Sequence, residues 1–363
     1  MKHSTTLSVN IPEKNAYSYD IIIGSNLLGQ ADEIIKNYTK ANKFLVVTNE
    51  TVAKLYKEKF NLQNADYVIL PDGEEYKNFD SLQKILDKAV ENRFERKDCI
   101  VALGGGVVGD MSGLAAAVYM RGIDFVQVPT TLLAMVDSSV GGKVAINHTN
   151  GKNLIGAFYQ PKVVLADIST LKTLDERQFK TGLGEVLKYA FIEKSCNAKT
   201  DFNFFEFLQT SKDKIYSLDE ITIVELVKIC CTLKSAVVNQ DETEKGLRAI
   251  LNLGHTFAHA IENLTSYTTY THGEAVTMGL ISAFELALSK NLITKDYYDK
   301  AVALVYEYQI TKNKPDIAKE EFYDEMFLDK KAQNGKVRFV LPNGPFSVDI
   351  FSDIEKNEVI SCL

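Results

Sequence analysis

Histidine is scarce in this chain, and its placement is uneven. Three of the five histidines, His255, His259 and His272, fall within one window of 18 residues. His255 and His259 are four residues apart, so on a helix they share one face and could both bind a metal. In an alternative of equal weight, one of them is a ligand or base and the other is a hydrogen-bonded core histidine. The H-E-x-x-H pattern of zincin proteases is absent.

A carboxylate and a third histidine extend this set. Thr271 and Glu274 flank His272 and are three residues apart, so they predict a capping box at the start of a helix and leave the imidazole free to coordinate. Glu185 stands among apolar neighbours, with Lys188 three residues on, and a semi-buried carboxylate needs a metal or a cation. Two histidines and one glutamate form an accepted catalytic zinc set. Spacing alone does not assemble it, because Glu185 is far from the histidines in sequence.

A glycine-rich turn indicates a nucleotide. The segment Gly104-Gly-Gly-Val-Val-Gly-Asp110 satisfies G-x-G-x-x-G, follows a predicted strand and precedes a helical stretch. Glycines let the backbone approach a pyrophosphate, and the helix N-terminus supplies oriented N–H groups. The alternative is a tight turn without a ligand, since a standard Rossmann fingerprint follows the first strand of its domain. A second segment, Asp72-Gly-Glu-Glu-Tyr-Lys77, could place Glu74 and Lys77 on a cofactor or form a charged surface turn.

Cations lie beside these motifs although the chain as a whole is acidic. The net charge of −7 and the pI near 5.4 argue against nucleic-acid binding, so an anionic ligand requires cations that are concentrated locally. Lys234 occupies an apolar position of a helical stripe, where a snorkelling lysine is the alternative. Convergence of such cations would suit a phosphorylated, carboxylated substrate, although each one singly is more often a surface residue. The others are Arg121, Lys143, Lys152, Lys188, Arg248 and the pair Lys330-Lys331.

The elements that must position these residues change in kind along the chain. Short β-branched runs alternate with amphipathic helices up to about residue 130, as in a parallel α/β sheet, and long helices follow from Thr181. We therefore expect an α/β domain over residues 1–177 and a mostly α-helical domain over residues 178–363. The predicted strands are Tyr19–Ile23, Lys43–Val47, Tyr67–Leu70, Cys99–Leu103 and Phe125–Val128. The predicted helices include Leu82–Val90, Met111–Met120, Ile221–Val238 and Glu274–Lys290.

The remaining composition excludes several classes of protein. No segment approaches 18 uninterrupted apolar residues, so no membrane span is predicted. The stretch Met1–Gly24 lacks the apolar core of a secretory signal. Five cysteines without a C-x-x-C pair argue for reduced thiols rather than a disulfide framework. These observations predict a cytoplasmic protein.

Several segments together resemble 3-dehydroquinate synthase, the shikimate-pathway enzyme, along nearly the whole chain. Their order and number make coincidence improbable. The matching segments are Gly104-Gly-Gly-Val-Val-Gly-Asp110, Pro129-Thr-Thr-Leu-Leu133, Val136-Asp-Ser-Ser-Val-Gly-Gly-Lys143, Gly151-Lys-Asn-Leu-Ile155, Gly184-Glu185, Asn252-Leu-Gly-His255 and His272-Gly-Glu-Ala275.

The resemblance implies a Rossmann-like NAD-binding α/β domain followed by a mostly α-helical metal- and substrate-binding domain, related to the glycerol dehydrogenase-like fold. It also implies a homodimer. Glu185, His255 and His272 match the family's zinc ligands, with Co²⁺ as a substitute metal. His259 matches a histidine of the substrate and proton-transfer network, which replaces the hypothesis that His255 and His259 bind the metal together.

Further residues are assigned by the same matching. Positions that match substrate or catalytic residues are Asp137, Lys143, Asn153, Lys188, Lys234, Arg248, Asn252 and Lys331, with Lys330 as the alternative to Lys331, and Arg121 matches a residue that reaches in from the partner subunit. Positions that match NAD contacts are Asn49, Asp72, Glu74, Lys77, Gly105, Gly106, Asp110, Thr130, Thr131, Lys143, Lys152 and Thr173. Asn49 and Thr51 stand where members typically carry Asp and Asn, so ribose recognition is expected to be weaker or arranged differently. Val144 and Ala258 replace a common Thr and Gly, and neither removes a titrating group.

The implied function is a carbon–oxygen lyase reaction. A 3-dehydroquinate synthase converts 3-deoxy-D-arabino-heptulosonate 7-phosphate, a phosphorylated keto acid, to 3-dehydroquinate and phosphate. The steps are transient oxidation by NAD, elimination of phosphate, re-reduction and ring closure. The alternatives are a metal-dependent polyol dehydrogenase, a sister cyclase that makes valiolone or inosose products, and a non-catalytic metabolite sensor on the same scaffold.

Overall fold

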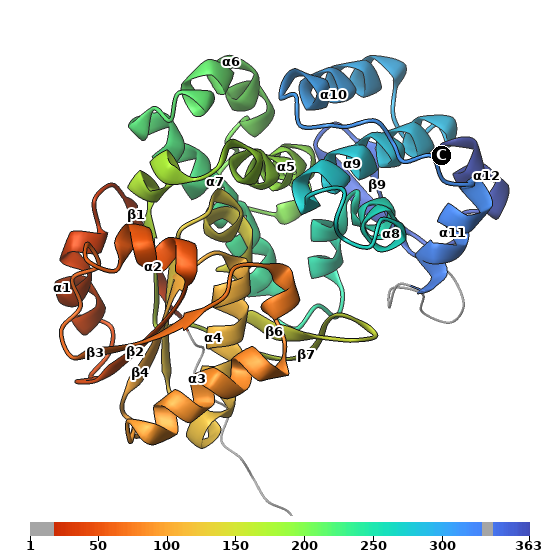
Figure 1. The fold of residues 1–363 in the computed structure, drawn as a ribbon. Coiled ribbons are helices and arrows are strands. Elements are labelled where there is room, and N and C mark those ends of the chain that lie inside the picture. The colour runs from red at the N-terminus through yellow and green to blue at the C-terminus, as the bar shows by residue number, and fades with distance from the viewer. Residues whose placement is uncertain (1–17, 329–336) are drawn as a thin grey trace, which may run out of the picture.

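The computed structural model describes residues 18–328 and 337–363, which form an α/β part and a mostly helical part. In Figure 1 the α/β part runs from red to yellow, and the helical part runs from green to blue. This arrangement confirms the predicted fold class. Lys331 and its alternative Lys330 lie outside the described residues. Among the helices that the structure describes, none is long and apolar enough to cross a membrane.

The α/β part is built on a parallel sheet of six strands in the order β1-β8-β5-β4-β2-β3. The sequence predicted five of the six strands to within a few residues and missed β8. The strands are β1 (Asp20–Gly24), β2 (Phe44–Asn49), β3 (Ala65–Leu70), β4 (Cys99–Gly104), β5 (Asp124–Pro129) and β8 (Val163–Asp167).

The strand order reverses beside β4. From β2 the chain moves outward to β3, and then returns to place β4 on the opposite side of β2, with β5 next to it. Ligands of open α/β sheets bind outside the carboxyl ends of the strands at such a reversal. The glycine-rich turn directly follows β4, so it lies at the reversal although it is not at the first strand of the chain.

Both faces of this sheet are buried, which explains why its strands are continuous apolar runs. Leu45 and Val47 of β2 pack in one cluster with α3 (Phe79–Glu91) and α4 (Gly106–Val118). Phe44 and Val46, the alternate residues, pack on the other face in a cluster with α1 (Ala31–Lys36) and α2 (Glu50–Tyr56). The period-2 alternation of a strand thus serves two helical layers.

The start of α4 differs from its prediction. The helix begins at Gly106, inside the glycine-rich turn, five residues before the predicted start at Met111. It ends at Val118 because Met120 has a left-handed backbone, with φ of 48°. The backbone of the turn therefore belongs to the first turn of the helix.

A β-hairpin extends from the α/β part towards the helical part (Figure 1). It consists of β6 (Lys143–His148) and β7 (Gly151–Phe158), which pair antiparallel, and it follows a short π-helical turn, η4 (Ala134–Ser138). The sequence did not predict this hairpin. Most of β7 is exposed or half-buried, so it lacks the apolar run that reveals a core strand.

The helical part contains eight helices and one small hairpin among the described residues. Predicted helices are confirmed in α7 and α9, and the predicted capping box of Thr271 and Glu274 is formed at the start of α9. The elements are α5 (Glu176–Ile192), α6 (Phe204–Tyr216), α7 (Glu220–Gln240), α8 (His255–Leu264), α9 (His272–Ser289), α10 (Lys295–Glu307), α11 (Lys319–Leu328), β9 (Phe339–Gly344), β10 (Ser347–Phe351) and α12 (Lys356–Ser361).

Glycines let three of these helices approach backbone to backbone. A Cβ on Gly184 of α5 would lie 2.6 Å from the backbone of Gly273 in α9, and a Cβ on Gly279 of α9 would lie 2.1 Å from the carbonyl oxygen of Gly254 before α8. Real Cβ atoms do not approach this closely. Three of these glycines adjoin the predicted metal ligands in sequence, so the close approach brings those ligands together.

We predict that Gly279→Ala destabilises the chain although alanine is the better helix former. The added methyl group must displace the backbone of Gly254, and overpacking of this kind costs about 1–3 kcal/mol. Thermal denaturation measures the change. Gly29→Ala is the matched control, because a Cβ there meets nothing within 4 Å. Equal melting temperatures for the two variants would contradict the prediction.

Candidate active site

The three predicted metal ligands converge at the meeting point of α5, α8 and α9. His255 and His272 are the first residues of their helices, and both direct Nε2 at Oε1 of Glu185, at 3.1 Å and 3.0 Å. One ligand atom from each residue lies within 4.8 Å of the others. Around a tetrahedral zinc with bonds of about 2.0–2.2 Å, ligand atoms lie about 3.4 Å apart. The three side chains therefore fit one metal ion.

Both imidazoles are oriented by an acceptor at the opposite nitrogen. Nδ1 of His255 lies 3.1 Å from the carbonyl oxygen of Leu253, and Nδ1 of His272 lies 3.4 Å from both oxygens of Glu262. An Nδ1–H that donates to these acceptors leaves the lone pair of Nε2 directed at the metal position, as in carboxylate–histidine–zinc triads. His259 packs edge-on against His255, with ring centroids 5.6 Å apart, and is outside the three-residue group.

The carboxylate of Glu185 is fully buried and neutralised by neighbouring groups. It is 1% exposed, and the ammonium of Lys188, which is 2% exposed, forms an ion pair with its Oε2. Burial would raise the pKa of Glu185, but Lys188 and His255 outweigh that effect and hold the pKa well below its usual value. Burial lowers the pKa of His255 to about 4. A neutral imidazole and an ionised carboxylate are the forms that bind metals.

A second carboxylate continues this chain of opposite charges. Oδ1 of Asp137, on η4, accepts hydrogen bonds from Lys234 at 2.7 Å and from the hydroxyl of Tyr189 at 3.0 Å, and Lys188 lies 4.0 Å away. Burial would raise the pKa of Asp137, but Lys234 and Lys188 lower it to about 2. Lys234 is 6% exposed and turns inward, so the snorkelling alternative is wrong. Nothing in the sequence pattern indicated Tyr189, because its role depends on packing of α5 against η4.

Two further predicted residues bind one acidic side chain, Glu244, and a third, Arg248, lies close enough to lower its pKa. Lys143 forms an ion pair with Glu244, and the amide of Asn252 donates to Glu244 at 3.2 Å. Arg248, 2% exposed, donates to the carbonyl oxygen of Gly141 at 3.0 Å, and its buried Nε has no hydrogen-bond partner. A carboxylate thus already occupies this group of donors, and the group has the chemistry of an anion site.

Seven of the predicted cofactor residues lie at the carboxyl edge of the sheet. They end or follow parallel strands, on the side where open α/β sheets bind ligands. Asn49 ends β2, Asp72 follows β3, Gly105 and Gly106 follow β4, Thr130 and Thr131 follow β5, and Thr173 follows β8.

The turn after β4 is shaped to admit an anionic group. No side chain caps the N-terminus of α4, so its first N–H groups lack that partner. A Cβ on Gly106 would lie 2.9 Å from the hydroxyl of Ser138, and one on Gly105 would lie 3.2 Å from Thr131. The hydroxyl of Thr130 is buried without a partner. These features fit the pyrophosphate of a dinucleotide.

The segment Asp72–Lys77 is largely exposed, but Glu74 is half-buried and Lys77 is buried. Lys77 is 4% exposed and donates to Asp110 at 2.6 Å and to Asn153 at 2.5 Å. Burial opposes its charge, but Asp110 raises the pKa of Lys77 above its usual value. The segment therefore joins the glycine-rich turn to the β6–β7 hairpin.

Asn49, the last residue of β2, and Thr51 both contact Asp72, a carboxylate that follows the neighbouring strand β3. The hydroxyl of Thr51 donates to Asp72 at 2.6 Å, and the amide of Asn49 also donates to Asp72. The acidic group at this corner is thus supplied by Asp72.

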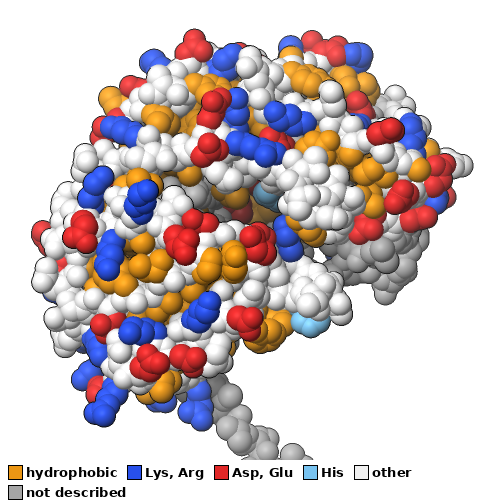
Figure 2. Space-filling model, in the orientation of Figure 1, with side chains coloured by type: hydrophobic (Ala, Val, Ile, Leu, Met, Phe, Trp, Pro, Cys, Tyr) orange, Lys and Arg blue, Asp and Glu red, His pale blue; other side chains and the backbone are white. Residues whose placement is uncertain are grey.

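The cofactor cradle and the metal position are neighbours. Gly106 lies against Ser138, which follows Asp137. Two ion pairs, both made by Lys188, link Asp137 to Glu185. Figure 2 shows the surface hollowed between the two parts of the chain, with histidine, acidic and basic side chains visible in and around the hollow.

Comparisons with known proteins agree with this arrangement. The N-terminal model of 3-dehydroquinate synthase matches residues 67–181, and the C-terminal model matches residues 182–332. The 3-dehydroquinate synthase of Desulforamulus reducens is 43% identical over 95% of this chain and 96% of its own length. The chain belongs to the 3-dehydroquinate synthase family.

Solved structures extend the likeness to the wider fold. 2-epi-5-epi-valiolone synthase from Streptomyces hygroscopicus subsp. jinggangensis, solved with NAD⁺ and Zn²⁺ bound, has a TM-score of 0.86 at 23% identity, with 98% of each chain covered. A 2-deoxy-scyllo-inosose synthase complexed with carbaglucose-6-phosphate, NAD⁺ and Co²⁺ has a TM-score of 0.81 at 25% identity, covering 94% of this chain and 95% of that one. A probable glycerol dehydrogenase from Sinorhizobium meliloti shares the fold at a TM-score of 0.64 and 14% identity, covering 96% and 97%.

Of the residues matched to the family, Arg121 lies apart from the groups described above, and Thr173 lies with the cofactor residues but has hydrogen-bond partners within the chain. Arg121 is exposed beyond the C-terminal end of α4, a 13-residue helix about 20 Å long whose other end carries the glycine-rich turn. Thr173 lies at the carboxyl edge of the sheet, but its hydroxyl is bonded to Tyr56 and to the carbonyl oxygen of Thr170.

We predict that Glu262→Gln weakens metal binding without removing a ligand. The amide cannot supply the negative charge that orients His272 and raises its basicity, and loss of such an outer partner lowers metal affinity about 10–100-fold. Competition with a coloured chelator measures the zinc dissociation constant. Glu33→Gln, an exposed acid on α1, is the control and should keep the wild-type constant. Equal constants for both variants would mean that Glu262 does not support the metal.

Proposed function

We propose that this chain is a 3-dehydroquinate synthase that converts 3-deoxy-D-arabino-heptulosonate 7-phosphate to 3-dehydroquinate and phosphate. The observation that carries the proposal is the group of Glu185, His255 and His272, which can hold one metal ion. The ion pairs of Lys188 with Glu185 and Asp137 connect this group to the glycine-rich turn, which has the shape to admit a dinucleotide. Membership of the family supports the same reaction. The lyase chemistry has no net redox change.

We assign Zn²⁺ to the three ligands, with Co²⁺ as a substitute, and NAD⁺ to the carboxyl edge of the sheet. When bound, the metal supplies Lewis acidity at a substrate hydroxyl, and NAD⁺ supplies a reversible hydride acceptor. The cyclase structure solved with NAD⁺ and Co²⁺ supports this pairing. The NAD⁺ residues are those matched above: Asn49, Asp72, Glu74, Lys77, Gly105, Gly106, Asp110, Thr130, Thr131, Lys143, Lys152 and Thr173.

The chain's own residues hold the substrate and its protons. We propose that Lys143, Arg248 and Asn252 bind anionic groups of the substrate where Glu244 now lies, since donors already arranged around a carboxylate need little reorganisation. Asp137, whose pKa is about 2, stays ionised and keeps Lys188 and Lys234 charged and fixed. His259 and Asn153 complete the proposed set, together with Lys331 outside the described residues.

The density of buried cations separates this function from its rivals. A polyol dehydrogenase would use the same metal and NAD⁺ but would have little use for Lys188, Lys234 and Arg248 gathered around one site. A sensor without catalysis would not need the intact group of Glu185, His255 and His272. The sister cyclases act on other sugar phosphates. The carboxylated substrate is favoured here by four residues that match the 3-dehydroquinate synthase pattern: Lys234, Arg248, Asn252 and His259.

We also propose a homodimer in which Arg121 completes the partner's site. Val118 and Met120 beside it are 49% and 43% exposed, which is unusual for large apolar side chains and suits an interface. We further propose a boundary at residue 177, between an α/β domain (residues 1–177) and a helical domain (residues 178–363), and a cytoplasmic location. The free cysteines among the described residues support the location.

A phosphate-release assay tests the reaction. Purified protein with NAD⁺, Zn²⁺ and the heptulosonate phosphate should release one phosphate per dehydroquinate, while absorbance at 340 nm shows no accumulation of NADH. The absence of NADH follows because the same bound cofactor returns the hydride. Steady NADH production from a polyol, without phosphate release, would identify a dehydrogenase instead.

A second prediction concerns the metal ligands. His272→Ala should lose both zinc and turnover while remaining folded, because two ligands no longer hold the ion tightly. Metal analysis, circular dichroism and the phosphate assay report the three properties. His148→Ala, on the exposed hairpin, is the matched control and should retain all three. Stoichiometric zinc in His272→Ala would make His259 the next candidate ligand.

A further inference from the structure

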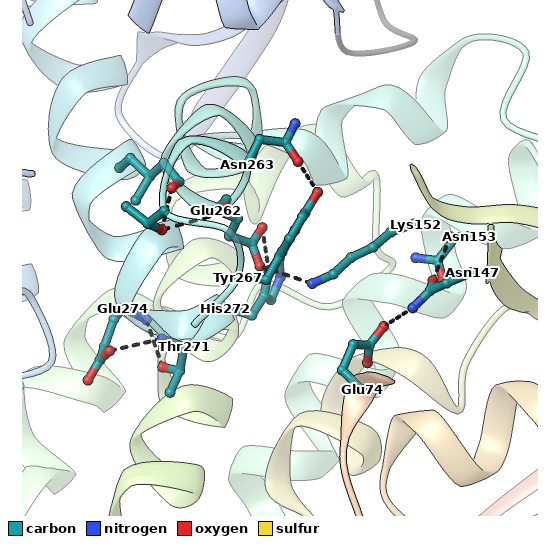
Figure 3. A network of polar contacts seen from close by, with 12 residues as sticks. Glu74, Asn147, Lys152, Asn153, Glu262, Asn263, Tyr267, Thr271, His272 and Glu274 are labelled. Carbon is teal, nitrogen blue, oxygen red and sulfur yellow. Dashed lines mark hydrogen bonds and ion pairs between the residues drawn. The ribbon is translucent and has the colours of Figure 1, made fainter. Parts of the chain in front are cut away.

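Lys152 connects the hairpin of the α/β part to the surroundings of the metal position. It lies on β7, and its ammonium is 3.6 Å from the centre of the Tyr267 ring and 3.9 Å from Oε1 of Glu262. Glu262 in turn contacts His272. Figure 3 shows Lys152 reaching from the side of the cofactor loop towards Tyr267 and Glu262. An ammonium over an aromatic face at this distance makes a cation–π contact.

The backbone around Lys152 is fixed to the cofactor loop. The amide of Asn147 donates to Glu74 at 2.8 Å, and its oxygen accepts from the backbone N–H of Asn153 at 2.9 Å. Lys77 donates to the side chain of Asn153, and the backbone N–H of Asn147 donates to the carbonyl oxygen of Lys77 at 2.7 Å. These bonds hold the residues on both sides of Lys152, so its long side chain is the adjustable element.

Tyr267 is held in a backbone conformation that side chains disfavour. Ser266 and Tyr267 both have left-handed backbones, with φ of 52° and 59°. Glycine adopts this region without strain, whereas a bulky residue there is an outlier. Strain of this kind persists where the surrounding structure requires the side chain, and it gathers at functional sites. The loop between α8 and α9 therefore carries an aromatic ring at a position where glycine would be easier.

The far edge of the same ring is also anchored. The hydroxyl of Tyr267 donates to Oδ1 of Asn263, and the amide of Asn263 donates to Glu325 of α11 at 3.0 Å. The loop backbone and this bonded pair fix the plane of the ring. A fixed ring face offers the ammonium of Lys152 one preferred position, which is beside Glu262.

We propose that Tyr267 is a positioning residue that seats Lys152 for cofactor binding, so that one ammonium serves both the cofactor and the acid behind His272. Because Lys152 is one of the proposed NAD⁺ contacts, the inference rests on the proposed function and deepens it. The aromatic face attracts the ammonium without the full neutralisation that a second carboxylate would cause, so Lys152 keeps charge for an anionic group of the cofactor. A flexible lysine without this seat would lose rotamer freedom on binding.

The test compares Tyr267→Leu with Tyr267→Phe in the zinc-loaded protein. Tyr267→Leu removes the ring face and should weaken NAD⁺ binding roughly tenfold by calorimetric titration. Tyr267→Phe keeps the face and should bind NAD⁺ within about twofold of the wild type. Tyr306→Leu, at an exposed tyrosine of α10, is the matched control. In a Lys152→Met background, Tyr267→Leu should cause no further loss, because the two side chains act through one contact.

Other results would overturn the inference. Wild-type NAD⁺ affinity in Tyr267→Leu would show that the ring does not position Lys152. Equal losses in Tyr267→Leu and Tyr267→Phe, with matching falls in melting temperature, would show a structural role instead. A full additional loss in the Lys152→Met background would make the two residues independent. A wild-type protein that binds no NAD⁺ would overturn the proposed function as well, whereas the other outcomes leave it standing.

Discussion

The buried carboxylate of Glu185 sets the main constraint on this structure. An ionised group that is 1% exposed is costly unless it is paired and hydrogen-bonded. Lys188 from its own helix supplies one partner, and the two imidazoles come from the starts of α8 and α9. Three helix segments must therefore meet within ligating distance. The glycines beside the ligands, such as Gly184 and Gly273, permit that approach because they carry no Cβ.

Buried side chains of alternating charge extend from the metal position to Lys234. Lys188 is shared between Glu185 and Asp137, and Asp137 in turn holds Lys234. Each of these four charges has an opposite neighbour, so none of the four is left uncompensated. Paired groups in such a network are held rigidly in place. Charged groups and dipoles that are fixed in advance stabilise the charge that develops in a transition state. The same contacts that make burial tolerable thus also preorganise the site.

The sequence revealed local features well and contacts between distant segments poorly. The strands near Cys99 and Phe125, the α/β class and the capping box at Thr271 follow from patterns a few residues long. Local spacing favoured His255 with His259, because helical periodicity says nothing of the carboxylate that arrives from another helix. Family resemblance supplied the grouping that spacing could not. Glu244, Glu262 and Tyr267 escaped because only tertiary packing gives them their partners.

The chain between η4 and β7, residues 134–158, explains why the two parts can act as one site. Its first turn places Asp137 against α5 and α7, and the hairpin that follows places Lys152 against α8 and the loop before α9. Both connections therefore belong to one continuous segment that is also bonded to the cofactor loop through Asn147. Three of the proposed substrate residues, Asp137, Lys143 and Asn153, belong to this segment, which contacts Lys77 of the cofactor loop on one side and Lys188, the partner of Glu185, on the other.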